Sequence, residues 1–451
     1  DVPDGPGGQF NVSGGGPTNG TQLRFGVPGF NSLCVAVPGA IPGDNSINLQ
    51  FRVADQSDRT FDSALVLDNV RVDTNCGTPG TMAVRQMTLS ANSQVETKDG
   101  SLIVRFAQNR APATSSNGSR TVFIANADYG GGNPFYLSQA FMMEGSAFSR
   151  LTNFTGDEVQ AIEISADGDF AAISARATPN DNLEIYRVNL DNGGITQITN
   201  TSGCDNTSPS VNNNGQRMAF LSTCGSDISA GFNADGNREM VFWNNGSFIV
   251  NETTACQSFR PIVNSTNSGR IAAFASDCNF TGANGDGNLE IFRMDRQGSV
   301  FQQITNTTDS GAVLDSVDIN RNGRYLVYIA QDAGGRYVVF RYDNNTGIST
   351  FQGVSRPDRL ITGVRIIDTN DGEDIFYEAL DLFAIPPTPG SLLGHIDVPS
   401  QIVTEGIANS NLSGITGARI GGVPHFYFSV TDDLVNMNGD TNLEIFEGRV
   451  E

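Results

Sequence analysis

One stretch of the sequence recurs along the chain and constrains the fold more than any other feature. Residues 288–306 read NLEIFRMDRQGSVFQQITN, residues 182–200 read NLEIYRVNLDNGGITQITN, and residues 442–450 repeat the first part as NLEIFEGRV. A fainter copy, NREMVFWNNGSFIVN, begins at Asn237. Each copy predicts two short strands joined by a turn, and two strands alone cannot bury a hydrophobic face. Each copy must therefore be part of a larger unit that repeats along the chain.

The larger unit adds two strands before this stretch. An apolar strand ends in a Ser-x-Asp/Asn-Gly pattern or a close variant, as in IEISADGDF, PSVNNNGQR and DINRNGRY, and a second strand follows, as in FAAISA and RMAFLST. Four strands in about 45 residues is the period of a β-propeller blade. The 51 glycines and the many Asn, Ser and Asp residues favour tight turns over helices. We predict an all-β protein with a seven-bladed propeller, six or eight blades being alternatives, whose blades begin near Ser101, Ala161, Ser208, Phe259, Leu314, Leu360 and Ile402.

These repeats resemble the propeller repeats of the TolB class, which are related to WD-repeat propellers. The resemblance rests on residues 151–152, 198–200, 209–220, 269–276, 286–292 and 304–306. It extends over roughly residues 101–450, is strong for 161–329 and weak for 362–406. The resemblance implies the fold only, because TolB-like propellers bind partners and also serve as non-catalytic domains of peptidases.

The remaining chain predicts the domain organisation. Residues 1–20 are rich in Gly, Pro and Asn and indicate a flexible or extended arm. Residues 21–76 alternate apolar and polar side chains and predict a small β-sandwich-like domain; the phrase INLQFRVADQSDRTFDSALVLDNVRV resembles the closing half of jelly-roll-like domains in bacterial surface proteins. Residues 77–80 form a linker, and 81–451 form the propeller. The last blade is one strand short, so we expect residues 81–90 to close it as its outer strand.

Charge and cysteine usage bear on the environment of the protein. The net charge of -22 argues against nucleic-acid binding, which needs a basic face, and no apolar run is long enough for membrane insertion. The chain begins at Asp1, which we interpret as removal of a leader peptide, or as a fragment produced by processing. Six cysteines in no C-x-x-C pair favour disulfides over zinc, and disulfides indicate an extracellular or cell-surface location. The expected pairs are Cys34 with Cys76, Cys204 with Cys224, and Cys256 with Cys278.

The loops that precede the NLE strands are the best candidates for a metal site. Oxygen-bearing side chains alternate there around a glycine, which is the kind of ligand that calcium prefers, although no complete calcium motif is present. The same residues also suit turns in which Asp and Asn bind their own backbone, and both interpretations remain open. The candidate calcium ligands are Asp235, Asn237, Glu239, Asp286, Asn288, Glu290, Asp440, Asn442 and Glu444.

The sequence shows no familiar catalytic motif. It contains no G-x-S-x-G elbow, no P-loop and no dinucleotide fingerprint, and His395 and His425 are its only histidines. A carboxylate pair for sugar cleavage does not stand out among the many acids. We therefore expect no enzymatic activity and no cofactor other than structural calcium.

Three functions remain open at this stage. The first is a secreted structural or adhesive surface protein, whose N-terminal arm and open β-segment would join copies of the chain into a homopolymer or filament. The second is a monomeric propeller that binds a glycan or a surface protein. The third is a secreted hydrolase or lyase that uses the propeller centre. Asn-x-Ser/Thr sequences such as those at Asn117 and Asn153 would carry glycans if the source makes them.

Overall fold

The computed structural model divides the chain into two compact units, residues 1–80 and residues 81–451. It describes residues 9–12 and 21–24 and most of residues 82–450, apart from 91–92, 97–101, 106, 130–132, 134, 251–254, 265, 267, 296–299, 354–358, 368–373, 382–390, 401, 410–411 and 432–441. In the first unit, β1 (Gln9–Val12) pairs antiparallel with β2 (Thr21–Arg24). The expected β-sandwich at residues 21–76 otherwise lies outside the described residues, as do Cys34 and Cys76.

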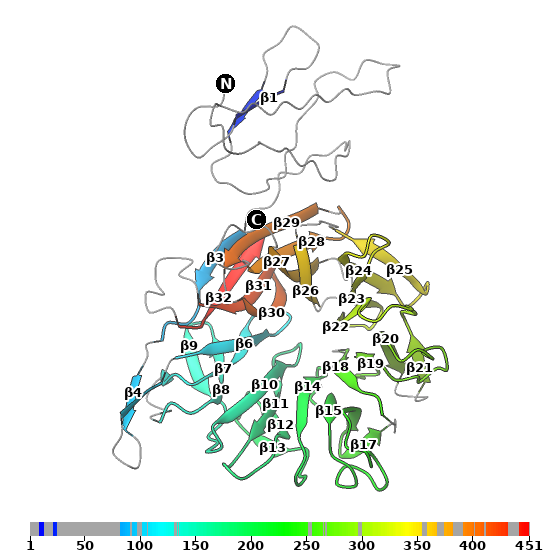
Figure 1. The fold of residues 1–451 in the computed structure, drawn as a ribbon. Coiled ribbons are helices and arrows are strands. Elements are labelled where there is room, and N and C mark those ends of the chain that lie inside the picture. Colours follow the sequence, from blue (N-terminus) through cyan, green and yellow to red (C-terminus); the bar gives the residue numbers. More distant parts are fainter. Residues whose placement is uncertain are drawn as a thin grey trace. The chain divides into compact units, whose positions relative to one another are not determined.

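The second unit is a ring of seven four-stranded antiparallel sheets (Figure 1). The first blade contains β6 (Asn109–Thr114), β7 (Arg120–Ala125), β8 (Gln139–Glu144) and β9 (Ala147–Arg150). The second contains β10 (Glu158–Ile164), β11 (Phe170–Arg176), β12 (Glu184–Asn189) and β13 (Ile195–Gln197). The third contains β14 (Asn206–Val211), β15 (Arg217–Ser222), β16 (Glu239–Asn244) and β17 (Ser247–Val250). The fourth blade contains β18 (Ser258–Val263), β19 (Ile271–Ser276), β20 (Glu290–Asp295) and β21 (Val300–Gln303). The fifth contains β22 (Val313–Ile319), β23 (Tyr325–Gln331), β24 (Tyr337–Asp343) and β25 (Ile348–Gln352). The sixth contains β26 (Arg359–Ile366), β27 (Asp374–Asp381), β28 (Ser391–Asp397) and β29 (Ile402–Asn409). The predicted seven-bladed, all-β propeller is thus confirmed.

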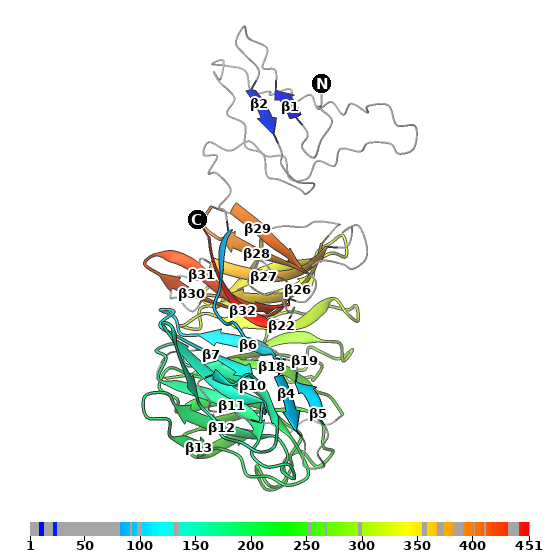
Figure 2. The ribbon, with the colours of Figure 1, turned by 90° about the vertical axis from the view of Figure 1, so that its left-hand side faces the viewer.

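The seventh blade joins the two ends of the second unit. It contains β30 (Ser413–Ile420), β31 (Val423–Val430) and β32 (Glu444–Val450), with β3 (Met82–Gln86) as its outer strand (Figure 1 and Figure 2). Met82 lies opposite Val450, and Gln86 lies opposite Phe446. An antiparallel ladder between strands from opposite ends of a ring leaves no blade incomplete, so the closure covers the edge that β32 would otherwise expose.

Two blades begin elsewhere than the repeats predicted. The first begins at Asn109 rather than near Ser101, because β4 (Ser93–Glu96) and β5 (Leu102–Arg105) form a separate two-stranded sheet. The seventh begins at Ser413 rather than near Ile402, because β29 pairs with β28 as the outer strand of the sixth blade. Both errors fall where the sequence lacks a clear copy of the repeat.

The Ser-x-Asp/Asn-Gly pattern explains the turn that joins the first two strands of a blade. Asn212 has no solvent exposure, and its Oδ1 accepts the backbone N–H of Arg217 at 2.8 Å across the turn. Its Nδ2 donates to the carbonyl of Thr266 in the next blade at 3.0 Å. Gly215 has a φ of 64°, which favours glycine at that place. One short motif therefore both closes a hairpin and joins neighbouring blades.

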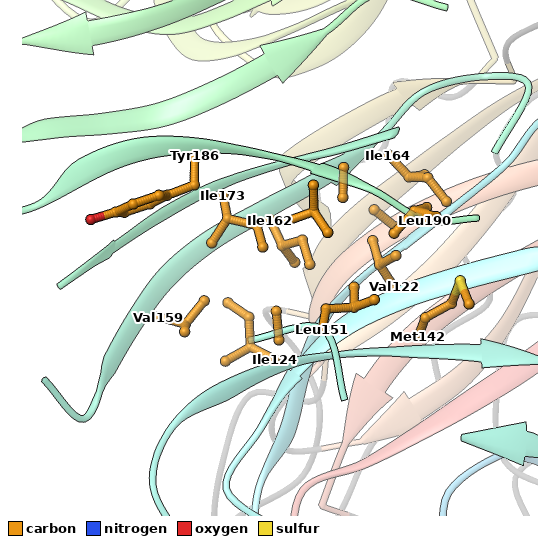
Figure 3. Close-up of a cluster of buried hydrophobic side chains, with 14 of the residues drawn as sticks. Val122, Ile124, Met142, Leu151, Val159, Ile162, Ile164, Ile173, Tyr186 and Leu190 are labelled. Carbon is orange, nitrogen blue, oxygen red and sulfur yellow. The ribbon is translucent and has the colours of Figure 1, made fainter. Parts of the chain in front are cut away.

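Apolar side chains fill the space between neighbouring blades. Between the first two blades, Val122 and Ile124 pack in one buried cluster with Val159, Ile162 and Ile173 (Figure 3). Because both faces of each sheet are covered, the second strands of the blades are almost continuously apolar, as FAAISA and RMAFLS show. No helix in the described part of the chain is long and apolar enough to cross a membrane.

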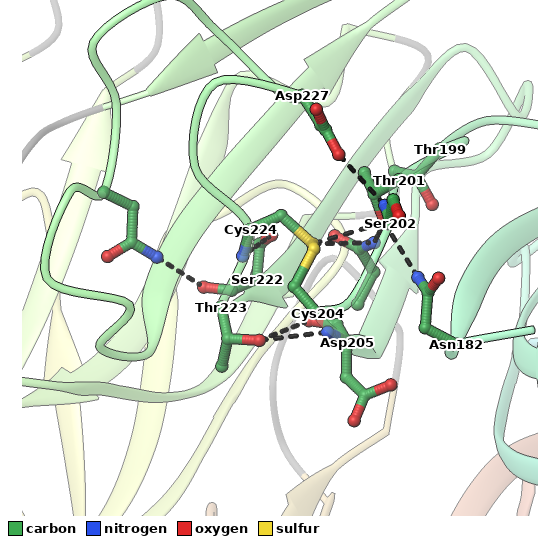
Figure 4. Close-up of a disulfide and its surroundings, with 12 residues drawn as sticks. Asn182, Thr199, Thr201, Ser202, Cys204, Asp205, Ser222, Thr223, Cys224 and Asp227 are labelled. Atoms are coloured by element: carbon green, nitrogen blue, oxygen red, sulfur yellow. Dashed lines mark hydrogen bonds between the residues drawn. A yellow bond between two sulfur atoms is a disulfide. The ribbon is translucent and has the colours of Figure 1, made fainter.

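Two disulfides lie at matching places in neighbouring blades. Cys204 is bonded to Cys224 (Figure 4), and Cys256 is bonded to Cys278, with a Cα–Cα distance of 5.1 Å in both. Each one ties the segment before an inner strand to the end of the second strand in the same blade. These two predicted pairs are confirmed, and they indicate an oxidising environment.

Candidate functional site

In the predicted calcium loop at residues 286–290, the fold exposes one of the expected ligands and buries another. Asp286 is exposed, whereas Glu290 is fully buried. One carboxylate oxygen of Glu290, Oε1, accepts the backbone N–H of Thr307 at 2.5 Å and its hydroxyl at 2.8 Å. The Nδ2 atom of Asn288 donates to the same hydroxyl at 2.9 Å. The alternation of oxygen ligands that the sequence displays therefore serves, at least in part, to hold the following segment.

The corresponding glutamates of other blades reach the next blade. Glu184 Oε1 accepts the backbone N–H and hydroxyl of Thr201, and its Oε2 accepts Nδ2 of Asn206 at 3.2 Å. Glu444 Oε2 accepts Nδ2 of Asn109 at 2.8 Å. Asn206 and Asn109 each begin the inner strand of the following blade. The buried glutamate of the NLE motif thus joins adjacent blades.

Among the other candidate metal ligands, too, some side chains are exposed and others are buried. Asp235 is exposed, and its pKa is lowered first by the backbone N–H of Ala255, which donates to Oδ2 at 2.9 Å. Glu239 is buried, Asn442 donates to the carbonyl of Ser90 at 2.6 Å, and Asp440 lies outside the described residues.

The side chains of Cys256, Asp277 and Cys278 come close enough together to resemble a metal site. However, the two sulfur atoms are bonded to each other, so neither can supply a thiolate ligand while the disulfide is intact. This group is therefore not a candidate for metal binding in the oxidised protein.

The centre of the propeller holds a second set of candidate residues. The first strand of each blade lies nearest the axis of the ring (Figure 1), and the region around this axis is called the channel below. Every one of these seven inner strands contains a β-bulge near its beginning. Bulges are frequent next to functional sites because they redirect a side chain. Four residues at the bulges have positive φ angles: Ala111 (52°), Ser208 (51°), Arg260 (42°) and Gly414 (65°). Positive φ is uncommon for residues other than glycine, and three of these four are not glycine.

Beyond the bulges, one residue of each inner strand takes the same place in the ladder with the second strand. Three of these residues bond to the backbone of the next inner strand: Ser210 accepts the N–H of Val263 at 3.0 Å, Asp318 that of Ile366 at 2.9 Å, and Thr416 that of Thr114 at 3.4 Å. The seven residues therefore form one layer around the channel: Ala113, Glu163, Ser210, Ile262, Asp318, Arg365 and Thr416.

Glu163 is the titratable group of this layer with the largest consequence. Glu163 is partly exposed on the inner strand of the second blade, and desolvation of its carboxyl group by the surrounding protein raises its pKa to about 7 from the ordinary value of 4.5. The charge of Arg365 opposes the rise, and that of Asp318 adds to it. Glu163 belongs to the second blade, whereas Asp318 and Arg365 belong to the fifth and sixth, so the three charges interact across the channel. A carboxyl group that titrates near neutrality in a channel is suited to acid–base chemistry.

Further charged groups continue from this layer to the mouth of the channel at the bulges. Arg260 lies at the bulge of β18 and is exposed. Desolvation by the surrounding protein and the like charge of Arg365 lower its pKa, and the charges of Asp315 and Glu378 raise it. Glu378 comes from the second strand of its blade. It lies opposite Gly363, where a Cβ atom would be 3.1 Å from Glu378 Oε2, so the glycine leaves room for this carboxylate to approach the channel.

Sequence reasoning missed these channel residues. A signal was present in the sequence. The second position of the repeat motif is acidic in IEIS and VDIN, whereas it is serine in PSVN and isoleucine in PIVN. A charged side chain on a strand that is otherwise apolar could have identified Glu163 and Asp318 as exceptions within the repeat.

Comparison with known proteins identifies the fold. No family model and no curated protein sequence matches the chain. Among solved structures, oligogalacturonate lyase from Vibrio parahaemolyticus has a TM-score of 0.53 and 11% identity, over 83% of this chain and 99% of that chain. An oligogalacturonate lyase in complex with manganese has a TM-score of 0.51 and 11% identity, over 83% and 98%. A prolyl endopeptidase has a TM-score of 0.50 and 10% identity, over 72% of this chain and 47% of that chain. At these identities the similarity shows a β-propeller fold alone.

The comparison overturns the expectation that the chain is not an enzyme. A propeller of this fold spans almost the whole of an oligogalacturonate lyase, and another forms part of a prolyl endopeptidase. The absence of hydrolase and nucleotide-binding motifs was therefore a wrong basis for excluding catalysis. The search for such motifs could not detect groups that come from separate blades and meet only in the channel.

Proposed function

We propose that the protein is exported and that its propeller binds an acidic sugar at the bulged mouth of the central channel. The observation that carries this proposal is the exposed guanidinium of Arg260 at the mouth, influenced by the charges of Asp315 and Glu378. The two disulfides support export, because such bonds persist in oxidising compartments.

The composition of the mouth supports a sugar ligand. The residues at or beside the bulges include the exposed side chains of Gln160, Asp315 and Thr362, together with the partly exposed Ser208. Amide, carboxylate and hydroxyl groups bind sugar hydroxyls, and a guanidinium binds a sugar carboxylate through two parallel hydrogen bonds. Within a protein of net charge -22, an exposed arginine in the channel is the group that would select an acidic sugar.

Calorimetric titration with an oligogalacturonate tests this proposal. We expect saturable binding that Arg260→Ala weakens at least about tenfold, because truncation removes the charge partner of the sugar carboxylate. Arg270→Ala is the matched control: Arg270 is also an exposed arginine of the fourth blade, but it lies beside the turn at the other end of the inner strand. Equal affinity of both variants, or equal binding of a neutral glucan of the same length, would refute the proposal.

A second candidate function at the same site is cleavage of the acidic sugar, which the near-neutral pKa of Glu163 favours. In an elimination, its carboxylate would take the proton from the carbon next to the sugar carboxylate. A carbon–carbon double bond then forms to the neighbouring carbon, whose bond to the glycosidic oxygen breaks, and the departing oxygen takes a proton from water. Incubation with polygalacturonate, followed by ultraviolet absorbance of the unsaturated product, tests this candidate. Product formation that Glu163→Gln abolishes supports it, and no product from the wild-type chain excludes it for this substrate.

The structural or adhesive role and the assembly into filaments remain predictions about the N-terminal unit. They depend on residues 1–20 and 21–76, most of which lie outside the described residues. If the arm joins copies of the chain, deletion of residues 1–20 should abolish filaments in electron micrographs of the purified protein. Filaments of normal length from the truncated chain would exclude this role of the arm.

A further inference from the structure

The buried carboxylate of Glu290 has one oxygen that lacks a hydrogen-bond partner. Glu290 has no solvent exposure, and its Oε1 is held by Thr307. Its Oε2 is also shielded from solvent and accepts no hydrogen bond. A buried oxygen of a charged group without a donor is costly, so such an atom points to a water molecule or an ion.

Comparison between blades explains why the donor is missing. The carboxylates of Glu184 and Glu444 receive an amide from Asn206 and Asn109, the first residues of the next inner strands. In the blade that follows Glu290, the inner strand begins with Val313, which lies opposite Ala330 as Asn206 lies opposite Ser222. Valine has no side-chain donor. The fourth blade therefore has the glutamate without the asparagine that is its partner for Glu184 and Glu444.

Two further oxygens of the same loop share this property. The Oδ1 atoms of Asn284 and Asn288 are buried and accept no hydrogen bond, in side chains that are 2% and 8% exposed. Their amide orientations are fixed by donation: Asn284 Nδ2 to the carbonyl of Asn288 at 2.9 Å, and Asn288 Nδ2 to that of Thr307 at 2.8 Å. Both Oδ1 atoms are therefore acceptors, and a flip of either amide would break an existing bond.

We propose that the loop of residues 284–290 binds a calcium ion through Asn284 Oδ1, Asn288 Oδ1 and Glu290 Oε2. Asn288 and Glu290 alternate on one face of the chain as it enters β20, and both contact Thr307. Asn284 contacts the backbone of Asn288. Three buried oxygen acceptors in one short loop match the ligands that calcium takes, with backbone carbonyls and water completing the shell.

The charge of the site predicts its affinity. A single carboxylate with two neutral amides gives a weak site, with a dissociation constant of about 10⁻⁴–10⁻³ M, as in extracellular calcium modules. Asp286, which the alternation pattern included, is exposed and is not among the ligands. The site differs from the sequence-based expectation in using Asn284, and it does not depend on the channel ligand proposed above.

Thermal melting of the full chain in a chelator and in increasing calcium tests the site, with calorimetry giving the affinity. We expect calcium to raise the melting temperature of the wild-type chain over the millimolar range, because an ion that binds only the folded state stabilises it. Magnesium at equal concentration should give a smaller shift, because it releases its water reluctantly. Glu290→Gln should remove the calcium response.

Glu184→Gln is the matched control, because both oxygens of Glu184 already have protein donors. This variant should retain the full calcium response, whatever its own stability. If Glu290→Gln fails to fold, Glu290→Asp keeps the charge, shortens the side chain and should weaken calcium binding at least about tenfold. An unchanged wild-type melting temperature in millimolar calcium, or a calcium response that survives in Glu290→Gln, would overturn the proposal.

Discussion

Glu444→Ala should lower the free energy of unfolding by about 3–5 kcal/mol. Glu444 is fully buried and accepts hydrogen bonds from the hydroxyl of Thr88, the backbone and hydroxyl of Ser90, and Nδ2 of Asn109. It therefore holds together the segment after β3, the seventh blade and the first blade. Alanine would leave several buried donors without their acceptor at the point where the ring closes. Chemical unfolding followed by tryptophan fluorescence and circular dichroism measures the loss.

Glu144→Ala is the control for this prediction. Glu144 ends β8 in the first blade, its side chain is 55% exposed, and it makes an ion pair with Arg120. An exposed pair of this kind contributes at most about 1 kcal/mol, so the control should stay close to the wild-type stability. If Glu444→Ala lowers the free energy of unfolding no more than Glu144→Ala does, the closure of the ring does not depend on the buried carboxylate.

The sequence was sufficient for the architecture because the repeats carry their own hydrogen-bonding chemistry. The motif around Asn212 both closes a hairpin and contacts the next blade, so its recurrence marks one blade each time. Where this motif is absent, the predicted first residue of a blade differs from the observed one. The sequence predicts the start of the seventh blade near Ile402, in β29, because a single apolar strand does not reveal which neighbour it pairs with.

The candidate sites were harder to predict because burial and distant contacts decide them. Alternation placed Asp286, Asn288 and Glu290 on one face, but it could not show that Asp286 is exposed while Glu290 is buried. Glu163 and Arg365 are about two hundred residues apart in the sequence, on separate blades. Only closure of the ring brings their charges together, so no local pattern could predict the raised pKa of Glu163.

Glu163→Gln should make the protein more stable at alkaline pH and leave its stability at about pH 4 and below almost unchanged. Burial raises the pKa of Glu163 from 4.5 to about 7, so between these values the folded chain binds more protons than the unfolded chain. Under that condition the free energy of unfolding falls as pH rises, and the loss is complete once pH exceeds the folded-state pKa. The shift corresponds to at most about 3 kcal/mol. Glutamine has nearly the same shape and cannot ionise, so it removes this loss.

Chemical unfolding of both proteins from about pH 4 to about pH 8.5 measures the difference as a function of pH. The advantage of Glu163→Gln should grow between the ordinary pKa of 4.5 and the folded-state pKa of about 7 and then remain constant, because a single group titrates. Glu158→Gln, on the same strand but with a side chain that is 42% exposed, should show no such alkaline advantage. Parallel pH profiles for Glu163→Gln and the wild type would mean that Glu163 ionises normally, which would also remove the argument for acid–base chemistry in the channel.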